Sequence, residues 1–336
     1  MTKEIAVLGA GSWGTALASA LAAQNYHVRI WARDSEQIAE MKAERENRRY
    51  LPGVRLTENV YPEADLEKAL DRAEIFLYAV PAQGFRQVFE QTLPYLRPEA
   101  ILVNAAKGIE RGSLLRLSEI VFQSRPEARY VVLSGPSHAE EVGKGLPTTL
   151  VAAAGERLLA EEIQDLLMSD SLRIYTSTDI VGVELGGALK NIIALGAGIS
   201  DGMGYGDNAK AAMMTRGLTE MARLGIASGA QEATFFGLAG IGDLIVTCTS
   251  MHSRNRRCGI LIGQGLSPAE ASAKVGMVVE GMFTTEAAYE LARAKGIQMP
   301  ITEHIYEVIQ GRMDAREAVK RLMTRKKKHE REEEFI

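Results

Sequence analysis

The sequence has little cysteine, little histidine and little net charge, and each shortage excludes a class of protein. Its only cysteines, Cys248 and Cys258, are two among 336 residues, so we expect reduced thiols and not a disulfide-bonded secreted scaffold. The five histidines are not spaced as metal ligands and no Cys-x-x-Cys pair is present, so no metal site is expected. The formal charge of −4 argues against a large surface for nucleic acid.

Long hydrophobic runs are also missing. No apolar stretch of about 20 residues lacks charges or glycines, so no integral membrane segment is expected. The apolar residues near the N-terminus form a short strand pattern and not the core of a signal peptide. With 46% hydrophobic and 24% charged residues, the composition is that of an ordinary globular protein. We therefore expect a cytoplasmic enzyme or binding protein.

The first half of the chain alternates short β-branched runs with longer amphipathic segments. This alternation predicts βαβ units and a mostly parallel sheet. Strands are expected at residues 4–8, 27–31, 75–80, 100–104, 130–134, 148–153 and 172–175. Helices are expected at 15–23, 35–46, 85–96, 114–122 and 156–168.

The pattern changes after residue 178 to helical periodicity with glycine-rich turns. Helices are expected at 181–199, 209–224, 232–236, 254–263, 268–275, 284–295, 301–310 and 315–323. A chain of this length favours two domains. We predict an α/β Rossmann-type N-terminal domain at 1–178, an all-α C-terminal domain at 179–325, and a charged tail at 326–336. For the tail, a solvated terminus is favoured over a partner-binding segment.

A glycine-rich turn lies directly after the first strand and before the first helix. Gly9, Gly11 and Gly14 match the pattern G-x-G-x-x-G. The first glycine permits the tight turn, the second lets a pyrophosphate approach the backbone, and the third lets the helix pack closely on the strand. The pyrophosphate would then lie on the N–H groups of the helix N-terminus. The context predicts a dinucleotide site and not an ordinary turn.

The residues at the tip of the second strand bear on the choice of dinucleotide. An acidic residue there would bind a ribose 2′-hydroxyl and favour NAD, whereas an arginine would pair with the 2′-phosphate of NADP. Both types are present, as Arg33 and Asp34. Because Arg33 comes first, we favour NADPH, with NAD tolerated; the alternative is that Arg33 is a plain surface residue.

A helix rich in glycine opens the second half and carries one lysine, Lys190, followed by Asn191. Glycine costs about 1 kcal/mol relative to alanine in a helix interior, so this number of glycines indicates tight packing. Burial disfavours the charged form of a lysine and brings it toward the range useful for general acid–base work. The alternative is that Lys190 extends to solvent.

Four further features are candidates for substrate contacts. Lys107 follows a buried strand, although a lysine there is more often exposed than catalytic. The run 134–137, Ser-Gly-Pro-Ser, lets a backbone approach a ligand closely. Asp243 is expected on a flexible turn, where it would hold a lysine or a hydroxyl or would cap a helix. Arginines 254, 256 and 257, near a serine and an asparagine, predict a phosphate clamp or a basic helix face.

Eight motifs in this order resemble those of NAD(P)-dependent glycerol-3-phosphate dehydrogenase of the soluble bacterial type. They are GAGSWGTALA, NRRYLPG, AAKGIE, SGPSHAEE, ELGGALKNIIALGAGI, GIGDLIVTC, SRNRR and VVEG. Together they cover almost the whole chain, except for the last residues, about 12 in number. The resemblance implies a Rossmann-type domain, an all-helical domain and an active site between them.

The resemblance also implies roles for individual residues. It gives Lys190 as the proton donor or acceptor, with Lys107 and Asp243 beside it in catalysis. Its substrate-binding positions are Lys107, Gly135, Ser137, Lys190, Asn191, Asp243, Ser253, Arg254 and Asn255. Its cofactor-binding positions, with those of the glycine turn, are Gly9, Gly11, Ser12, Trp13, Gly14, Arg33, Tyr50, Lys107, Ala139, Arg254, Val278 and Glu280.

The implied reaction is the NAD(P)H-dependent interconversion of dihydroxyacetone phosphate and sn-glycerol 3-phosphate, which supplies phospholipid synthesis. Hydride goes to C2 while Lys190 protonates the alkoxide and Lys107 adds positive charge to the growing oxyanion. The expected partner is a small phosphorylated substrate, and a homodimer is a hypothesis that the sequence leaves open. Two alternatives remain at this point: a 6-phosphogluconate or ketopantoate type of dehydrogenase, and a dinucleotide sensor without catalysis.

Overall fold

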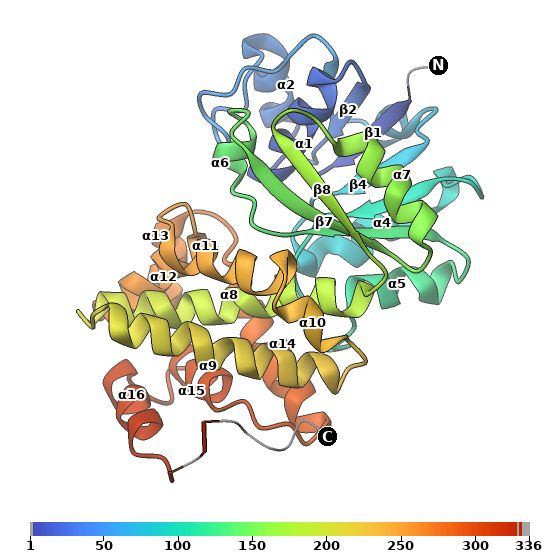
Figure 1. Cartoon of the computed structure of the whole chain (residues 1–336). Coiled ribbons are helices and arrows are strands. Elements are labelled where there is room, and N and C mark those ends of the chain that lie inside the picture. The colour runs from blue at the N-terminus through green and yellow to red at the C-terminus, as the bar shows by residue number, and fades with distance from the viewer. Residues whose placement is uncertain (1–2, 328, 331–336) are drawn as a thin grey trace. The chain divides into compact units, whose positions relative to one another are not determined.

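The computed structural model describes residues 3–327, 329 and 330, which form two packed units (Figure 1). The first unit comprises Met1–Gly108 and Leu115–Glu184, and the second comprises Ile109–Leu114 and Leu185–Ile336. The short segment Ile109–Leu114 thus packs with the second unit although its neighbours in sequence belong to the first. The expected domain limits of 1–178 and 179–325 remain proposals. Most of the expected charged tail, residues 328 and 331–336, lies outside the described residues.

The first unit is a single eight-stranded sheet with helices around it, as the alternating pattern predicts. The strand order is β3-β2-β1-β4-β5-β6-β7-β8, and every neighbouring pair is parallel except β6 with β7. The strands are β1 (Glu4–Leu8), β2 (His27–Trp31), β3 (Val60–Glu63), β4 (Ile75–Tyr78), β5 (Ile101–Asn104), β6 (Arg129–Ser134), β7 (Thr148–Ala154) and β8 (Leu172–Ser177). The chain order reverses between β1 and β4, where open α/β sheets bind ligands.

The helices of the first unit connect these strands. They are α1 (Ser12–Ala23), α2 (Ser35–Glu44), α3 (Leu66–Leu70), α4 (Phe85–Thr92), α5 (Leu117–Ser124), α6 (Ala139–Val142) and α7 (Arg157–Leu167), with 3-10 turns η1 (Ala82–Gly84) and η2 (Leu93–Tyr95). The central strands β4 and β5 are buried along their whole length, which explains their continuous apolar runs.

The expected strands and helices of the first unit are present, but helices α3 and α6 are not predicted and several helix ends differ. Strand β3 is not predicted either, because its run is short and contains Pro62, which suits an edge strand that pairs only with β2. The helix expected at 114–122 begins at Leu117, since Leu114 has a φ of 60° that no helix accommodates. The helix expected at 35–46 ends at Glu44, because Arg45 is left-handed with a φ of 51°.

The described part of the second unit is helical. Its helices are α8 (Ile180–Gly202), which begins in the first unit, α9 (Asp207–Ile226), α10 (Glu232–Phe235), α11 (Asp243–Thr249), α12 (Arg254–Gly263), α13 (Pro268–Val275), α14 (Glu280–Ala294), α15 (Pro300–Ile309) and α16 (Ala315–Met323), with a π-helical turn η3 (Leu238–Gly242) before α11. Helix α11 and the turn η3 are not predicted. Helix α14 begins at residue 280 and not at the expected residue 284, so the VVEG motif leads directly into it.

Glycines set the distance between α8 and α12. A Cβ atom on Gly198 would overlap the carbonyl oxygen of residue 256, and one on Gly202 would overlap that of residue 260. The contact is reciprocal, because Gly259 and Gly263 of α12 face the backbone of α8 at Leu195 and residue 199 in the same way. The two helices therefore pack backbone against backbone, which is the packing that the many glycines of α8 indicate.

Two stretches are long and apolar enough to cross a membrane by length and composition alone, Ile180–Gly202 and Glu232–Thr249. The apolar window of the first is 89% buried inside the protein, as in the core helix of a globular unit. The second is divided into α10, η3 and α11. This is weak evidence for a membrane segment, and the core position of α8 accounts for its composition without one.

The contact between α8 and α12 leads to a prediction about stability. Replacing Gly259 by alanine places a methyl group on the backbone of α8, so we expect a loss of about 1–3 kcal/mol in the free energy of unfolding. Urea denaturation of G259A measures it. The matched control is G155A, since a Cβ on Gly155 meets no atom within 4 Å. Equal stability of the two variants would contradict the packing described here.

Candidate functional site

Each of the three glycines in the G-x-G-x-x-G turn has a different structural role. Gly9 has a φ of 112°, and a Cβ there would lie 2.7 Å from the carbonyl oxygen of Ala79 at the end of β4. A Cβ on Gly14 would overlap the carbonyl oxygen of Gly9, so this glycine lets α1 pack on the turn. A Cβ on Gly11 would meet nothing within 4 Å. The space beside Gly11 is therefore open to a ligand, as the motif predicts.

Two buried amides hold this turn in place. Gln37 Nε2 donates to the carbonyl oxygen of Ala10 at 2.6 Å, and Asn47 Nδ2 donates to the same oxygen at 2.9 Å. Asn47 Nδ2 also lies 2.7 Å from Thr15 Oγ1 of α1. Neither amide is predicted from the sequence; the only signal for Asn47 is that it begins the NRRYLPG motif.

The N-terminus of α1 is suited to an anion. Its N-cap is Gly11, so no side chain accepts hydrogen bonds from the first-turn amides. The indole Nε1 of Trp13 is buried and has no hydrogen-bond partner among the described residues. Ser12 Oγ donates to the carbonyl oxygen of Tyr50 at 2.6 Å, which brings together two residues expected at the cofactor. Uncapped amides and an unpartnered indole N–H fit the phosphates of a dinucleotide.

Two neighbouring residues at the tip of β2, Arg33 and Asp34, differ in their contacts. The carboxylate of Asp34 caps α2, accepting from the backbone N–H groups of Glu36 and Gln37, both at 3.1 Å. It also pairs with Arg49 at 3.0 Å. Arg33 is exposed. The acid is thus occupied locally while the guanidinium faces solvent, and its pairing with a 2′-phosphate stays a prediction.

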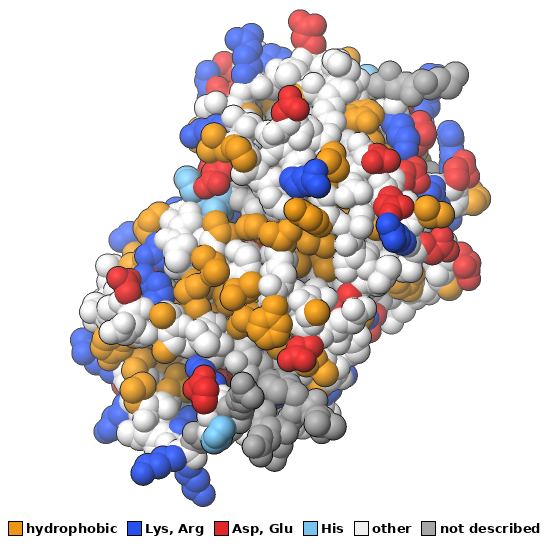
Figure 2. Space-filling model, in the orientation of Figure 1, with side chains coloured by type: hydrophobic (Ala, Val, Ile, Leu, Met, Phe, Trp, Pro, Cys, Tyr) orange, Lys and Arg blue, Asp and Glu red, His pale blue; other side chains and the backbone are white. Residues whose placement is uncertain are grey.

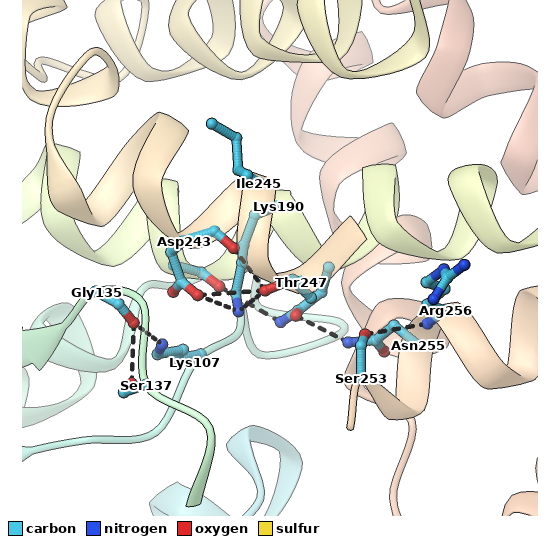
Figure 3. A network of polar contacts seen from close by, with 12 residues as sticks. Lys107, Gly135, Ser137, Lys190, Asp243, Ile245, Thr247, Ser253, Asn255 and Arg256 are labelled. Atoms are coloured by element: carbon cyan, nitrogen blue, oxygen red, sulfur yellow. Dashed lines mark hydrogen bonds and ion pairs between the residues drawn. The ribbon is translucent and has the colours of Figure 1, made fainter. Parts of the chain in front are cut away.

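Lys107 and the loop after β6 share one carbonyl oxygen. Lys107 Nζ donates to the oxygen of Gly135 at 3.0 Å, and Ser137 Oγ donates to it at 2.9 Å (Figure 3). Gly135 has a φ of 132°, so a side chain there would be strained. Ala139 follows as the buried first residue of α6. The structure therefore brings together these expected residues at the carboxyl ends of β5 and β6.

Lys190 is the centre of a buried polar group in the second unit. Its Nζ lies 2.7 Å from Asp243 Oδ1 and 2.7 Å from Thr247 Oγ1 (Figure 3). The hydroxyl of Thr247 donates to the backbone oxygen of Asp243 at 2.6 Å. Lys190 is 6% exposed and Asp243 is 1% exposed. Burial disfavours the ammonium form, but the carboxylate stabilises it, so the two effects on Lys190 oppose each other.

The expectation that Asp243 lies on a flexible turn is wrong. Asp243 is the first residue of α11, immediately after the π-helical turn η3. A Cβ on Gly186, one turn before Lys190 on α8, would lie 2.6 Å from the carbonyl oxygen of Ala239 in η3. This close approach fixes the start of α11 against α8. The glycines of the GIGD run are typical of loop residues, whereas in the structure they form a π-helical turn of a kind often found at functional sites.

A second buried group connects α8, α12 and α14. Asn255 Nδ2 donates to Asn191 Oδ1 at 2.8 Å, and Asn255 Oδ1 accepts from the backbone N–H of Gly281 at 2.8 Å. A Cβ on Gly281 would lie 2.6 Å from the carbonyl oxygen of Asn191. The resemblance places Asn191 and Asn255 at the substrate, which stays a prediction; in the structure, their side chains link α8, α12 and α14. Val278 and Glu280 lie beside this link, before and at the start of α14.

The arginine cluster at the start of α12 divides into two parts. Ser253 is the N-cap, and its Oγ accepts from the backbone N–H of Arg256 at 3.2 Å. The side chain of Arg256 pairs with Asp201 at 2.7 Å and donates to the backbone oxygen of residue 249 at 2.8 Å. Arg256 is therefore a structural residue and not part of a clamp. Arg254, the first residue of α12, remains the candidate for binding the substrate phosphate.

Among the described residues, neither the two cysteines nor the residues of metal-binding type form a further reactive site. Burial raises the pKa of the Cys248 thiol to about 12 and that of Cys258 to about 11, so both thiols are protonated at neutral pH. Among the described residues, no group of three or more His, Cys, Asp or Glu side chains could hold a metal ion.

Sequence models of one family match both halves of the chain. The N-terminal model of NAD-dependent glycerol-3-phosphate dehydrogenase matches residues 4–160, and its C-terminal model matches residues 179–320. The chain belongs to the glycerol-3-phosphate dehydrogenase family. The resemblance stated from the eight motifs is thereby confirmed.

Relatives in this family are similar over their whole length. The glycerol-3-phosphate dehydrogenase [NAD(P)+] of Pelotomaculum thermopropionicum is 55% identical over 99% of this chain and 96% of its own. That of Bacillus velezensis is 50% identical over 98% and 97%. The crystal structure of the Coxiella burnetii glycerol-3-phosphate dehydrogenase has a TM-score of 0.92 at 38% identity, covering 96% of this chain and 99% of its own.

A ketopantoate reductase also resembles this chain, but only in fold. The Ralstonia eutropha enzyme has a TM-score of 0.60 at 14% identity, over 95% of this chain and all of its own. An identity this low shows a shared architecture alone. The alternative of a ketopantoate type of dehydrogenase is therefore not favoured.

The buried pair of Lys190 and Asp243 leads to a prediction about stability. Removing one charge leaves the other buried without its partner, so K190M and D243L should each lose about 3–5 kcal/mol in the free energy of unfolding. The double variant K190M/D243L buries no unpaired charge and should lose much less than the sum. A double-mutant cycle by urea denaturation measures this coupling. Simple additivity would show that the pair is not a coupled unit.

Proposed function

We propose that the chain catalyses the NAD(P)H-dependent interconversion of dihydroxyacetone phosphate and sn-glycerol 3-phosphate. Its full-length similarity to glycerol-3-phosphate dehydrogenases [NAD(P)+] supports this reaction. The single observation that carries the chemistry is the buried Lys190, held between Asp243 and Thr247. A dinucleotide sensor without catalysis would have no use for this group, and no observation favours that alternative.

The residues around the glycine turn fit a dinucleotide. Gly9, Gly11 and Gly14 shape the turn, and the amides of Ser12 and Trp13 at the start of α1 would bind its phosphates. When bound, the nicotinamide supplies or takes up a hydride. Arg33 would pair with the 2′-phosphate of NADP, which we take as the preferred form. The other residues assigned to the cofactor from the family resemblance are Tyr50, Lys107, Ala139, Arg254, Val278 and Glu280.

Lys190 is assigned the proton transfer. Its ammonium group would protonate the substrate oxygen as the carbonyl is reduced and would take the proton back in the reverse direction. Asp243 and Thr247 fix Nζ in one place, so that little reorientation is needed during the reaction. Lys107 would add positive charge to stabilise the developing alkoxide. Gly135 and Ser137, which share an oxygen with Lys107, would contact the substrate beside it.

Arg254 is assigned the phosphate of the substrate. A guanidinium binds phosphate oxygens in a bidentate manner, and Ser253 and Asn255 flank it at the start of α12. Asn191 and Asn255 hold α12 against α8, so they would set the distance between Arg254 and Lys190. The distance between Arg254 and Lys190 would then determine how long a substrate can be when it contacts both residues.

The cellular location, metabolic role and partners of the protein are proposed from its family and composition. We place it in the cytoplasm, as a supplier of glycerol phosphate for phospholipid synthesis. The partners we propose are a small phosphorylated substrate and a second copy in a homodimer. No nucleic acid is expected as a partner, given the net charge of −4.

The direct test is to follow NADPH absorbance when dihydroxyacetone phosphate is added to the purified chain and to K190A. We expect turnover by the chain and a kcat lower by about 100-fold or more in K190A, because the proton donor is lost. Binding of NADPH, measured by fluorescence, should be unchanged in K190A. Near-normal turnover of K190A would remove Lys190 from the mechanism, and no turnover by the chain itself would refute the function.

The phosphate clamp is tested with R254A. Loss of a charge-assisted pair should raise the KM for dihydroxyacetone phosphate by about 10- to 100-fold. The measured contrast is activity on unphosphorylated dihydroxyacetone at saturating NADPH, since Arg254 is also assigned to the cofactor. This compound has no phosphate, so its turnover should change little. Equal effects on both compounds would argue against the clamp. The control is R257A, because Arg257 belongs to the same arginine cluster but is not among the substrate positions that the resemblance implies.

Cofactor preference is tested with R33A. If Arg33 pairs with the 2′-phosphate, the KM for NADPH should rise by about tenfold while that for NADH stays the same. Steady-state kinetics with both cofactors measure this. A parallel change for NADH and NADPH would show that Arg33 is a plain surface residue.

A further inference from the structure

The ion pair between Asp34 and Arg49 lies in the part of the first unit where a dinucleotide is distinguished by its ribose. Arg49 Nη1 lies 3.0 Å from Asp34 Oδ2, and Asp34 directly follows Arg33 at the tip of β2. In a Rossmann-type fold, an acidic residue or an arginine near this tip recognises the ribose 2′-position. The resemblance gives Arg33 a role at the cofactor but gives none to Arg49. Arg49 is therefore a cation that the proposed function leaves without a role.

The two carboxylate oxygens of Asp34 have separate contacts. Oδ1 accepts from the backbone N–H groups of Glu36 and Gln37, both at 3.1 Å, and so caps α2. Oδ2 accepts from Arg49 Nη1 at 3.0 Å. Separation of Arg49 from Asp34 therefore leaves the helix cap intact. Asp34 Oδ2 is the oxygen that can exchange its partner.

This ion pair is exposed, so little free energy is needed to separate it. The side chain of Arg49 is 61% exposed and that of Asp34 is 43% exposed. Exposed pairs contribute little to stability, because water competes for both charges. A phosphate group would offer the guanidinium of Arg49 a stronger, bidentate contact. A 2′-phosphate would therefore compete effectively with Asp34 for this guanidinium.

The backbone around Arg49 is fixed beside the glycine turn. Asn47 Nδ2 donates to the carbonyl oxygen of Ala10 at 2.9 Å, and Ser12 Oγ donates to that of Tyr50 at 2.6 Å. The backbone N–H of Tyr50 donates to the carbonyl oxygen of Asn47 at 3.2 Å, which closes a tight turn. The guanidinium of Arg49 lies 5.2 Å from the centroid of the Tyr50 ring. A change of partner therefore needs only a rotation of the Arg49 side chain.

The end of the first unit that carries α2 is not uniformly positive. Lysine and arginine side chains lie there among aspartate and glutamate side chains (Figure 2). Arg48, the neighbour of Arg49, pairs with Glu44 at 2.9 Å and lies 3.7 Å from Glu46. Mixed charges give little net field at a distance. A phosphate would therefore be recognised here by individual guanidinium groups and not by a broad positive surface.

We propose that Arg49 is a specificity-determining residue that exchanges its partner according to the dinucleotide; this inference rests on the proposed cofactor site. With NADP, the guanidinium of Arg49 turns from Asp34 Oδ2 to the 2′-phosphate, which it holds together with Arg33. With NAD, Arg49 keeps its pair with Asp34, and Oδ2 also accepts from the ribose 2′-hydroxyl. One acid and two arginines would thus admit both cofactors, with a preference for NADP.

The first experiment measures binding of NADPH and NADH to R49A by fluorescence titration, without turnover. Loss of one guanidinium should raise the Kd for NADPH by about tenfold and leave the Kd for NADH within about twofold. R49K keeps the charge but not the bidentate geometry, so it should recover part of the affinity for NADPH. The matched control is R48A, since Arg48 is similarly exposed at 56% and pairs with Glu44; neither Kd should change. Equal effects of R49A on both cofactors, or no effect, would overturn the proposal.

The second experiment uses D34N to separate the two oxygens of Asp34. Asparagine is an equally good N-cap, so α2 should keep its cap while the charge that holds Arg49 is lost. We expect the Kd for NADPH to fall by about threefold, because Arg49 gives up no ion pair. The Kd for NADH should rise by about threefold, because a neutral oxygen is a weaker acceptor for the 2′-hydroxyl. An unchanged ratio of the two Kd values would overturn the exchange of partners.

A third experiment distinguishes failure of this inference from failure of the proposed function. Adenosine 2′,5′-bisphosphate carries the 2′-phosphate without a nicotinamide, so it should displace NADH from the unmodified chain. About tenfold more of it should be needed with R49A. If the unmodified chain binds both dinucleotides and R49A needs no more of the competitor, only the role of Arg49 is refuted. If the unmodified chain binds neither dinucleotide, the proposed cofactor site is refuted, and this inference with it.

Discussion

The close packing of α8 against its neighbours is the constraint on which the second unit depends. Gly186 lets the π-helical turn η3 approach α8, while Gly198 and Gly202 let α12 do the same. Lys190 lies between these two contacts along the helix. The first contact places Asp243 within 2.7 Å of its ammonium group, and the second sets the start of α12, where Arg254 lies. The glycines of α8, which have no side chain, thus allow the close packing that positions the charged residues of the site.

The two units carry different parts of the proposed chemistry by different physical means. In the first unit, backbone groups form the proposed cofactor site: an open turn at Gly11 and the uncapped N-terminus of α1 fit an anionic cofactor. In the second unit, side chains carry the proposed chemistry. Lys190 and Asp243 form a buried pair, in which each charge is stabilised by its partner. A substitution that removes one charge therefore affects both stability and chemistry, which is why the double variant is needed to separate them.

Much of this could be predicted from the sequence, because periodicity and glycine motifs are local signals. The strands of the parallel sheet, the G-x-G-x-x-G turn and the lysine on a glycine-rich helix are of this kind. The supports of the site are not. Gln37 and Asn47 hold the turn through contacts between residues far apart in the chain. The glycines of GIGD predict a loop, although Asp243 begins a helix. Arg256 resembles a phosphate ligand until its pairing with Asp201 is seen. Such roles come from tertiary contacts, which no local pattern encodes.

The most direct test of the account is the turnover of G186A with dihydroxyacetone phosphate and NADPH. A methyl group at this position would lie 2.6 Å from the carbonyl oxygen of Ala239, so η3 and the start of α11 must move away from Lys190. The account predicts a folded protein with unchanged NADPH binding and a kcat lower by about 10- to 100-fold. A folded G186A with the kcat of the unmodified chain would contradict the claim that glycine packing on α8 positions the reacting lysine.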